Sequence, residues 1–266
     1  MHGNHVPLKF ASLGSGSDGN ALLISAGNGT ARTTVMLDCG FGVREAERRL
    51  ERLGMRPCEL SGILVTHEHQ DHVGGVFKFA RRHDIGVWLT HGTAQAVGSD
   101  ATGVALTICR DAEMLVIGAL HILPYTVPHD AREPVQYVLG DGVNKLGVLT
   151  DAGHATAHVI GVLGGCNALM LECNHDHTML ANSVYPQFLK NRIGGDYGHL
   201  SNATSSAILA AIDQSRLKTV VGAHLSNQNN TPALALHALS SAVDASRTSV
   251  SVACQKEGFG WIEIIA

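Results

Sequence analysis

The chain has 266 residues, of which 45% are hydrophobic, 16% charged and 5% aromatic, and its formal net charge at pH 7 is −4. A chain this apolar can offset its conformational entropy by burial, which excludes a disordered protein, and 30 scattered glycines with 7 prolines exclude a fibrous repeat. The slight acidity argues against general polyanion binding, which requires an excess of Lys and Arg. The unusual number is 16 histidines, because histidine is the commonest metal ligand.

Short strands separated by glycine-rich turns are predicted at the start of the chain. The strands are expected over 8–13, 21–25 and 34–37, and the turns over 14–19 and 27–29. Residues 43–53 then show helical spacing of apolar residues, and Gly54 stands where a C-terminal cap would. Residues 63–65 form a short apolar run typical of a buried strand, which ends directly in Thr66 and His67.

Helices and strands alternate through the rest of the chain. Helices are expected over 72–83, 92–97, 155–163, 178–193, 202–214 and 232–245. Strands are expected over 86–90, 114–127, 135–140, 146–150, 168–172, 219–223 and 248–264. No long linker, low-complexity run or fixed period interrupts this alternation, which is typical of an α/β fold. The sequence therefore predicts a single domain over residues 1–266, with two sheets.

Features that would place the chain in a membrane are missing from the sequence. It contains no run of about 18 apolar residues, and residues 1–10 lack the cationic and apolar stretches of a signal peptide. The six cysteines contain no Cys-x-x-Cys pair, so they are interpreted as reduced thiols rather than a disulfide framework. We therefore expect a cytoplasmic protein without membrane contact.

One short segment holds most of the chemical information. Residues 67–72 read H-E-H-Q-D-H, which matches H-x-H-x-D-H, between an apolar strand and a predicted helix. Alternate residues of extended backbone point the same way, so His67 and His69 can bind one cation. Asp71 and His72 lie on the following turn and can face a second cation. Imidazoles with a carboxylate suit Zn²⁺, Mn²⁺ or Fe²⁺, and four ligand-type residues in six positions argue against a merely polar loop.

This segment and the upstream strand that ends in Asp38 resemble the metallo-β-lactamase fold. Further segments resemble the YycJ/WalJ-type branch, beginning with G-S-G-S-D-G-N at 14–20, which is similar to an S-G-S-x-G-N opening. The other matching segments are 128–131 with Pro134 and Tyr137, 150–153, 172–176, 198–202, and 223–226 with Asn229 and Asn230. They occur in order from Ser12 to Asn230. The resemblance implies an αββα sandwich, two stacked sheets flanked by helices, with metals at one edge.

The resemblance also implies a set of metal ligands and two divalent ions, zinc or manganese, with iron as the alternative. One ion would be held by His67, His69 and His129, the other by Asp71, His72 and His224, with Asp151 bridging both. The residues agree with this assignment, because His129, Asp151 and His224 each follow a strand-like run and would arrive at one sheet edge. When His129, Asp151 or His224 is considered alone, an ordinary exposed loop residue is the commoner interpretation. Asp38 is expected to support the ligand loop through hydrogen bonds rather than bind metal.

His199 best separates the candidate substrates. It resembles the histidine that phosphodiesterases of this fold, tRNA 3′-processing ribonucleases among them, place near the scissile phosphate as general acid or phosphate contact. A phosphodiester leaves as an alkoxide that needs a proton, unlike a thioester. The alternative is a surface residue that merely precedes a helix. The other expected catalytic residues are Asp71, Glu172 and His175, and the other expected supporting or substrate contacts are Asn20, Ser15 and Asn174. The resemblance implies that Glu172, Asn174 and His175 are polar partners of His199.

The motif match is closest to the branch regarded as 5′→3′ DNA exonucleases. The resemblance therefore implies a dinuclear-metal phosphodiesterase that acts on DNA through a metal-bridging hydroxide. A small cyclic phosphodiester and a thioester, lactone or lactam are the alternative substrates, and a non-catalytic binding protein is an alternative of another class. The sequence does not decide between DNA and RNA or give the strand polarity. It also leaves undecided the metal, the protein partners and the oligomeric state.

Basic residues that could contact a nucleic-acid strand form three clusters, for each of which a solvated helix face is the favoured interpretation. They are Arg44, Arg48 and Arg52; Lys190 and Arg192; and Arg81 and Arg82. Two positions depart from the family pattern. Gln136 stands where a small residue is more usual, which predicts a narrower pocket, and His154 adds an imidazole close to Asp151.

Overall fold

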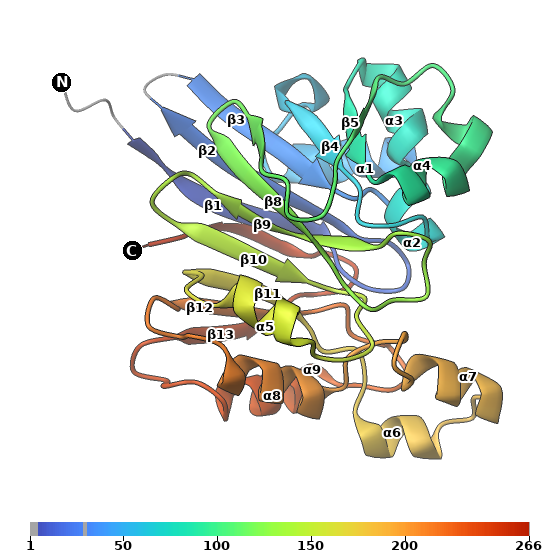
Figure 1. Cartoon of the computed structure of the whole chain (residues 1–266), viewed down its shortest axis with the longest axis vertical. Coiled ribbons are helices and arrows are strands. Elements are labelled where there is room, and N and C mark those ends of the chain that lie inside the picture. The colour runs from blue at the N-terminus through green and yellow to red at the C-terminus, as the bar shows by residue number, and fades with distance from the viewer. Residues whose placement is uncertain (1–4, 29–30, 266) are drawn as a thin grey trace.

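The computed structural model describes residues 5–28 and 31–265. The sequence predicts no signal peptide in residues 1–10 and a turn over residues 27–29. Parts of both segments lie outside the described residues. Within them, the strands form two sheets of seven strands that stack face to face, with helices on both outer sides (Figure 1). This is the expected αββα sandwich.

The first sheet holds most of the N-terminal half of the chain. Its strands, in spatial order, are β14 (Phe259–Glu263), β1 (His5–Gly14), β2 (Ala21–Asn28), β3 (Ala31–Leu37), β4 (Gly62–Leu64), β5 (Val87–Leu89) and β6 (Leu106–Ile108). Strands β14 to β3 pair antiparallel, and β3 to β6 pair parallel. Parallel strands end at one edge of the sheet, so Asp38 and Thr66, which follow β3 and β4, lie there together.

The second sheet repeats this arrangement with the C-terminal half. Its strands, in spatial order, are β13 (Ser249–Val252), β12 (Thr219–Ala223), β11 (Ala168–Glu172), β10 (Lys145–Leu149), β9 (Val135–Gly140), β8 (Leu120–Thr126) and β7 (Leu115–Ile117). Strands β10 to β13 are parallel. Their carboxyl ends bring Asp151, Glu172 and His224 to one edge.

Helices cover the outer faces of the sheets. The helices of the first half are α1 (Val43–Arg52), α2 (Gln70–Val73), α3 (Val76–His83), α4 (His91–Val97) and the 3₁₀ turns η1 (Pro57–Glu59) and η2 (Gly98–Ala101). Those of the second half are α5 (Ala157–Leu163), α6 (His177–Asn182), α7 (Gln187–Ile193), α8 (Asn202–Ala211) and α9 (Pro232–Ser240). Figure 1 shows α1, α3 and α4 beside the first sheet and α5, α8 and α9 beside the second, while α6 and α7 extend away from the body.

Three apolar clusters hold these layers together. Phe10, Tyr137 and Met170 belong to the cluster between the two sheets. Leu50 of α1 packs on the outer face of the first sheet, and Leu209 of α8 on that of the second. Each such side chain contributes roughly 1.5–3 kcal/mol on burial. Within the described residues, no helix has the length and apolar character that spanning a bilayer requires.

The helix predicted over 72–83 is two helices, because Gly74 and Gly75 separate α2 from α3. A Cβ on Gly75 would overlap the carbonyl oxygen of Phe41. The pair of glycines therefore lets the segment that begins with the H-x-H-x-D-H motif pass against residues 39–41. Apolar periodicity alone could not reveal this close approach.

Three other predicted elements are also divided. The strand predicted over 114–127 is the hairpin β7–β8, which turns at Gly118 with φ of 52°. The strand predicted over 248–264 is β13 and β14, which belong to different sheets. The helix predicted over 178–193 is α6 and α7, because Pro186 has no N–H and disfavours a helical residue before it. No strand is predicted from the sequence at β6, an edge strand whose residues are exposed.

Replacing Gly75 by alanine is expected to lower the free energy of unfolding by about 1–3 kcal/mol, because the new Cβ would overlap backbone. Equilibrium unfolding in urea measures this. Gly161→Ala is the matched control: Gly161 lies within α5 with nothing within 4 Å of an added Cβ, so alanine there is expected to stabilise by about 0.5–1 kcal/mol. Equal changes in the two variants would contradict the close-approach argument.

Candidate metal centre

Asp38 holds the loop that leaves β4. Thr66 donates through its backbone N–H and its hydroxyl to the two carboxylate oxygens of Asp38, each at 2.8 Å. The same carboxylate lies 2.8 Å from Nδ1 of His72. Asp38 has φ of 60°, a conformation that costs energy for a residue with a side chain and that these contacts offset. With Nδ1 occupied, His72 is oriented with Nε2 toward the ligand-type residues.

Three imidazoles converge at one point. Nε2 of His67 lies 3.0 Å from Nδ1 of His69, which lies 3.2 Å from Nε2 of His129. The second ring nitrogen of His67 lies 2.9 Å from the Thr66 hydroxyl, and that of His129 lies 3.0 Å from the carbonyl oxygen of Gly198. These outer contacts fix the rings, so three nitrogen donors from the ends of β4 and β8 face a common centre.

A second group contains Asp71, His72 and His224. Oδ2 of Asp71 lies 3.4 Å from Nε2 of His224 and 3.5 Å from Nε2 of His72. Asn20 places Nδ2 3.3 Å from the same oxygen. The backbone N–H of His224 donates to the Ser15 hydroxyl at 2.9 Å. Asn20 and Ser15 therefore hold ligand-type residues in place and connect the glycine-rich turn to both sheets.

Asp151 lies between the two groups. Its Oδ2 is 3.2 Å from Nε2 of His72, and its Oδ1 is 3.3 Å from Nδ1 of His224. The residue is 1% exposed, and among the described residues neither carboxylate oxygen has a hydrogen-bond partner. Its φ of 53° adds backbone strain. A buried carboxylate without hydrogen bonds is costly unless a cation offsets its charge.

The charges of the site fit a divalent cation. Burial alone would lower the pKa of His224, but the Asp151 carboxylate and the hydrogen bond to Asp71 raise it to about 10. Burial alone would raise the pKa of Asp151, but the charges of His224 and His72 hold it well below its usual value. The site thus favours positive charge beside buried carboxylates. Its nitrogen and oxygen donors suit Zn²⁺, Mn²⁺ or Fe²⁺.

Glu172, at the end of β11, is fully buried behind the site. Its Oε1 lies 2.9 Å from Nδ1 of His199 and 3.1 Å from Nδ1 of His224. Its Oε2 accepts the backbone N–H groups of Ala152 and Leu200, both at 3.1 Å. Burial alone would raise the pKa of Glu172, but the charge and hydrogen bond of His199 lower it to about 2. Glu172 is not among the residues that line the pocket, and its carboxylate holds His199 and His224 from behind.

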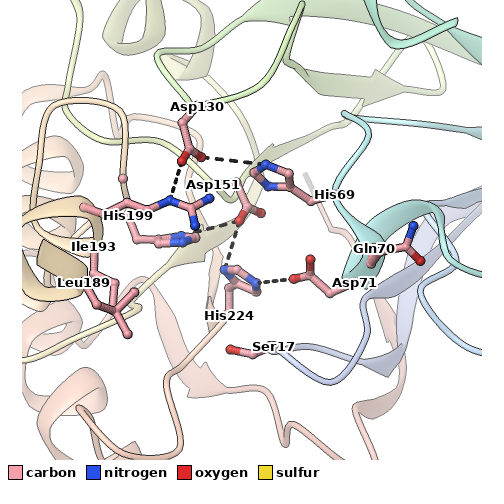
Figure 2. Close-up of a pocket in the computed structure, with 12 residues that line it drawn as sticks. Ser17, His69, Gln70, Asp71, Asp130, Asp151, Leu189, Ile193, His199 and His224 are labelled. Carbon is pink, nitrogen blue, oxygen red and sulfur yellow. Dashed lines mark hydrogen bonds and ion pairs between the residues drawn. The ribbon is translucent and has the colours of Figure 1, made fainter. Parts of the chain in front are cut away.

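His199 lines the pocket (Figure 2). Its Nδ1 also lies 3.4 Å from Oδ1 of Asp151. Burial alone would lower the pKa of His199, but the charge and hydrogen bond of Glu172 raise it above the usual value. Because Nδ1 of His199 contacts Glu172, Nε2 is the ring nitrogen that can contact a ligand.

His175 and Asn174 lie behind the pocket and are not among its lining residues. The backbone of His175 pairs with that of Ser201 in an isolated bridge. The His175 ring is buried, and neither of its nitrogens has a hydrogen-bond partner among the described residues. Asn174 donates to the carbonyl oxygen of His224 at 3.1 Å. The catalytic contact predicted for His175 is therefore not seen, and Asn174 supports His224.

The pocket has a volume of about 360 Å³. Asp71, Asp151, His199 and His224 are among the residues that line it (Figure 2). Several lining residues had no site role predicted from the sequence, among them Leu189, Ile193 and Asp130. Leu189 and Ile193, one turn apart on α7, form an apolar wall. Asp130 accepts from Nε of Arg192 at 2.7 Å at the rim. Nothing in the periodicity of α7 distinguishes this wall from an ordinary core-facing stripe.

Most of the other polar residues singled out from the sequence bond within the protein. Gln136 is buried in β9 and donates to the carbonyl oxygen of Thr150 at 2.7 Å, so the prediction that it narrows the pocket is wrong. Arg48 pairs with Glu45 at 2.7 Å on α1. His154 lies 2.8 Å from the carbonyl oxygen of Asp196. Arg192 is the one residue of the basic clusters that lines the pocket, as far as the described residues show.

Comparison with known proteins identifies the family. A family model described as a beta-lactamase superfamily domain matches residues 33–225. The chain belongs to the β-lactamase superfamily. Over 257 residues it is 33% identical to the exodeoxyribonuclease YycJ of Bacillus anthracis, which covers 95% of this chain and 91% of the relative. It is 28% identical over 237 residues to the exodeoxyribonuclease WalJ of Streptococcus pneumoniae, which covers 87% of each chain.

Solved structures of this superfamily share the fold. The metallo-β-lactamase fold protein YhfI from Bacillus subtilis superposes with a TM-score of 0.72 at 16% identity, covering 97% of this chain and 100% of the other. The 33% identity to YycJ confirms the resemblance to the YycJ/WalJ-type branch along nearly the whole chain, and the superposition confirms the αββα sandwich. Within this superfamily, the His and Asp groups at the sheet edge are the candidate metal centre.

Proposed function

We propose that this superfamily member is a dinuclear-metal phosphodiesterase that degrades DNA from its 5′ end. The observation that carries the proposal is His199, held by Glu172 at 2.9 Å beside the converging imidazoles and carboxylates. The names of the YycJ and WalJ relatives, both exodeoxyribonucleases, support DNA as the substrate.

The two groups of donors are the proposed metal ligands. We assign one ion to His67, His69 and His129, and the other to Asp71, His72 and His224. Asp151 lies within reach of both groups and is the proposed bridging residue. Two divalent ions would lower the pKa of a water molecule and neutralise charge on the phosphate. The buried Asp151 oxygens, which lie 3.2 Å from Nε2 of His72 and 4.0 Å from Nε2 of His129, support this assignment.

His199 is proposed to protonate the leaving oxygen. The leaving alkoxide of a phosphodiester is a strong base, so a positioned imidazolium accelerates its departure. Glu172 favours the imidazolium, because its carboxylate raises the pKa of His199. A thioester leaves as a thiolate, which needs no proton, so this arrangement has no evident use in a thioesterase.

The proposal is tested by a time course on DNA oligonucleotides labelled at either end, with Mn²⁺ or Zn²⁺ restored after chelation. We expect a 5′ label to appear first as a mononucleotide and a 3′ label to appear on progressively shorter strands. Intact DNA after incubation with metal-loaded protein would contradict the proposal. Hydrolysis of a cyclic dinucleotide, an RNA strand or S-lactoylglutathione, run in parallel, identifies the alternative substrates.

Replacing Glu172 by glutamine is expected to shift the alkaline limb of the kcat–pH profile to lower pH. Activity that needs the imidazolium of His199 is lost as the pH rises through its pKa, and Glu172 raises that pKa. The neutral amide removes this support, so the loss begins at lower pH. Glu113→Gln, at an exposed side chain on the surface, is the matched control. An unshifted limb in the Glu172 variant would show that another group titrates.

A further inference from the structure

The segment that supplies the apolar wall of the pocket also carries exposed apolar side chains. Of the large apolar side chains that are exposed in the described residues, three lie between residues 184 and 197: Val184 is 93% exposed, Phe188 73% and Tyr197 63%. Helix α7 contains no buried residue. Figure 1 shows α6 and α7 extending from the body. The chain that follows α7 reaches the pocket at Gly198.

Helix α7 continues from the pocket outward. Residues four apart lie on one helical row, so Phe188 and Arg192 share a row next to that of Leu189 and Ile193. Arg192, Leu189 and Ile193 all line the pocket, whereas Phe188 does not. Phe188 therefore lies one turn beyond Arg192 along the row, outside the pocket rim.

Tyr197 is a second exposed aromatic residue next to the pocket in the chain. It precedes Gly198, which lines the pocket, and its carbonyl oxygen accepts the backbone N–H of Asp130 at 3.0 Å. Asp130 also accepts from Nε of Arg192 at 2.7 Å, so Asp130 connects the backbone of Tyr197 to α7 at the pocket rim. The Tyr197 ring itself stays exposed.

We propose that α7 and Tyr197 bind unpaired nucleobases of the strand whose terminal phosphodiester enters the metal pocket. Phe188 and Tyr197 stack on bases outside the rim, and Leu189 and Ile193 contact the terminal nucleotide. Every base has a π face, so such stacking is independent of sequence, as degradation of arbitrary DNA requires. A pocket of about 360 Å³ is at the small end of ligand sites and admits one nucleotide rather than a duplex end.

This inference rests on the proposed nuclease function, and its test separates the two. The holoenzyme is assayed on a single-stranded oligonucleotide and on bis-p-nitrophenyl phosphate, which has no neighbouring bases. Phe188→Ala is expected to lower the ratio of kcat/KM for the oligonucleotide to that for the small diester by about tenfold, mainly through KM. Phe188→Tyr is expected to restore the ratio, because it keeps an aromatic face. Val116→Ala, at an exposed residue of β7, is the control whose ratio stays unchanged.

A binding signal gives a second readout. An oligonucleotide carrying 2-aminopurine near its 5′ end is expected to lose fluorescence on stacking with the wild-type protein and to lose less with Phe188→Ala. If wild-type protein cleaves DNA and the Phe188→Ala ratio is unchanged, the inference is overturned and the nuclease function stands. If wild-type protein leaves DNA intact, both are overturned. A dimer that Phe188→Ala converts to a monomer would assign this surface to contacts between copies and overturn the inference.

Discussion

Replacing His199 by alanine is expected to reduce kcat on DNA by about 10²–10⁴-fold while the metal content of the protein is unchanged. The variant removes the imidazole that Glu172 holds at 2.9 Å in the pocket, and it leaves the proposed ligand groups in place. Single-turnover cleavage of an end-labelled oligonucleotide measures the rate, and elemental analysis measures the metal.

The leaving group distinguishes proton donation from a structural effect. p-Nitrophenolate departs without a proton, so hydrolysis of bis-p-nitrophenyl phosphate is expected to fall much less in the His199→Ala variant than cleavage of DNA. Equal losses on both substrates would contradict the role of His199 as an acid. Loss of metal from the variant would instead indicate that His199 is a ligand, since it lies 3.4 Å from Asp151.

Replacing Asp151 by asparagine is expected to lower metal affinity by at least about tenfold and to abolish measurable cleavage of DNA. The neutral amide removes the negative charge that lies between the two donor groups, 3.2 Å from His72 and 3.3 Å from His224. Titration with Mn²⁺ or Zn²⁺ after chelation gives the affinity and the number of ions per chain.

Asp244→Asn is the matched control for Asp151. Asp244 is exposed, and its carboxylate accepts the backbone N–H and the hydroxyl of Ser246, with no contact to a proposed ligand. The control is expected to bind metal as the wild-type protein does. Two ions bound at wild-type affinity by the Asp151→Asn protein would contradict the bridging role, and fewer than two ions bound by the wild-type protein would contradict a dinuclear centre.

Local sequence determined the parts of this protein in which neighbours in the chain are also neighbours in space. The alternation of apolar runs and helical stripes predicted most helices and strands, and the H-x-H-x-D-H segment predicted a cluster of donors. His67, His69 and His72 lie within six residues directly after β4, so backbone geometry alone brings them together. The order of the later motif segments then pointed to the superfamily and to its sandwich fold.

Tertiary structure decided what depends on contacts between distant segments. The predicted helix is interrupted at Gly75 because this residue packs against the backbone of Phe41. Strands β13 and β14 belong to different sheets, which the pattern of apolar residues does not reveal. Glu172 lies beside His199, as the resemblance implies, but only the tertiary structure shows that the same carboxylate also contacts His224. His175, three residues on, is buried and contacts neither His199 nor the pocket in the described residues.

The residues on the substrate side of the pocket could not be predicted from the sequence either, because they too depend on contacts between distant segments. In the sequence, Leu189 and Ile193 have the spacing of core residues. They line the pocket because α7 extends beside His199. The sequence alone thus determined which donors this protein has and in what order they follow its strands. Parallel pairing in two sheets decided that those strand ends meet at one edge, because each parallel partner starts and ends beside its neighbour.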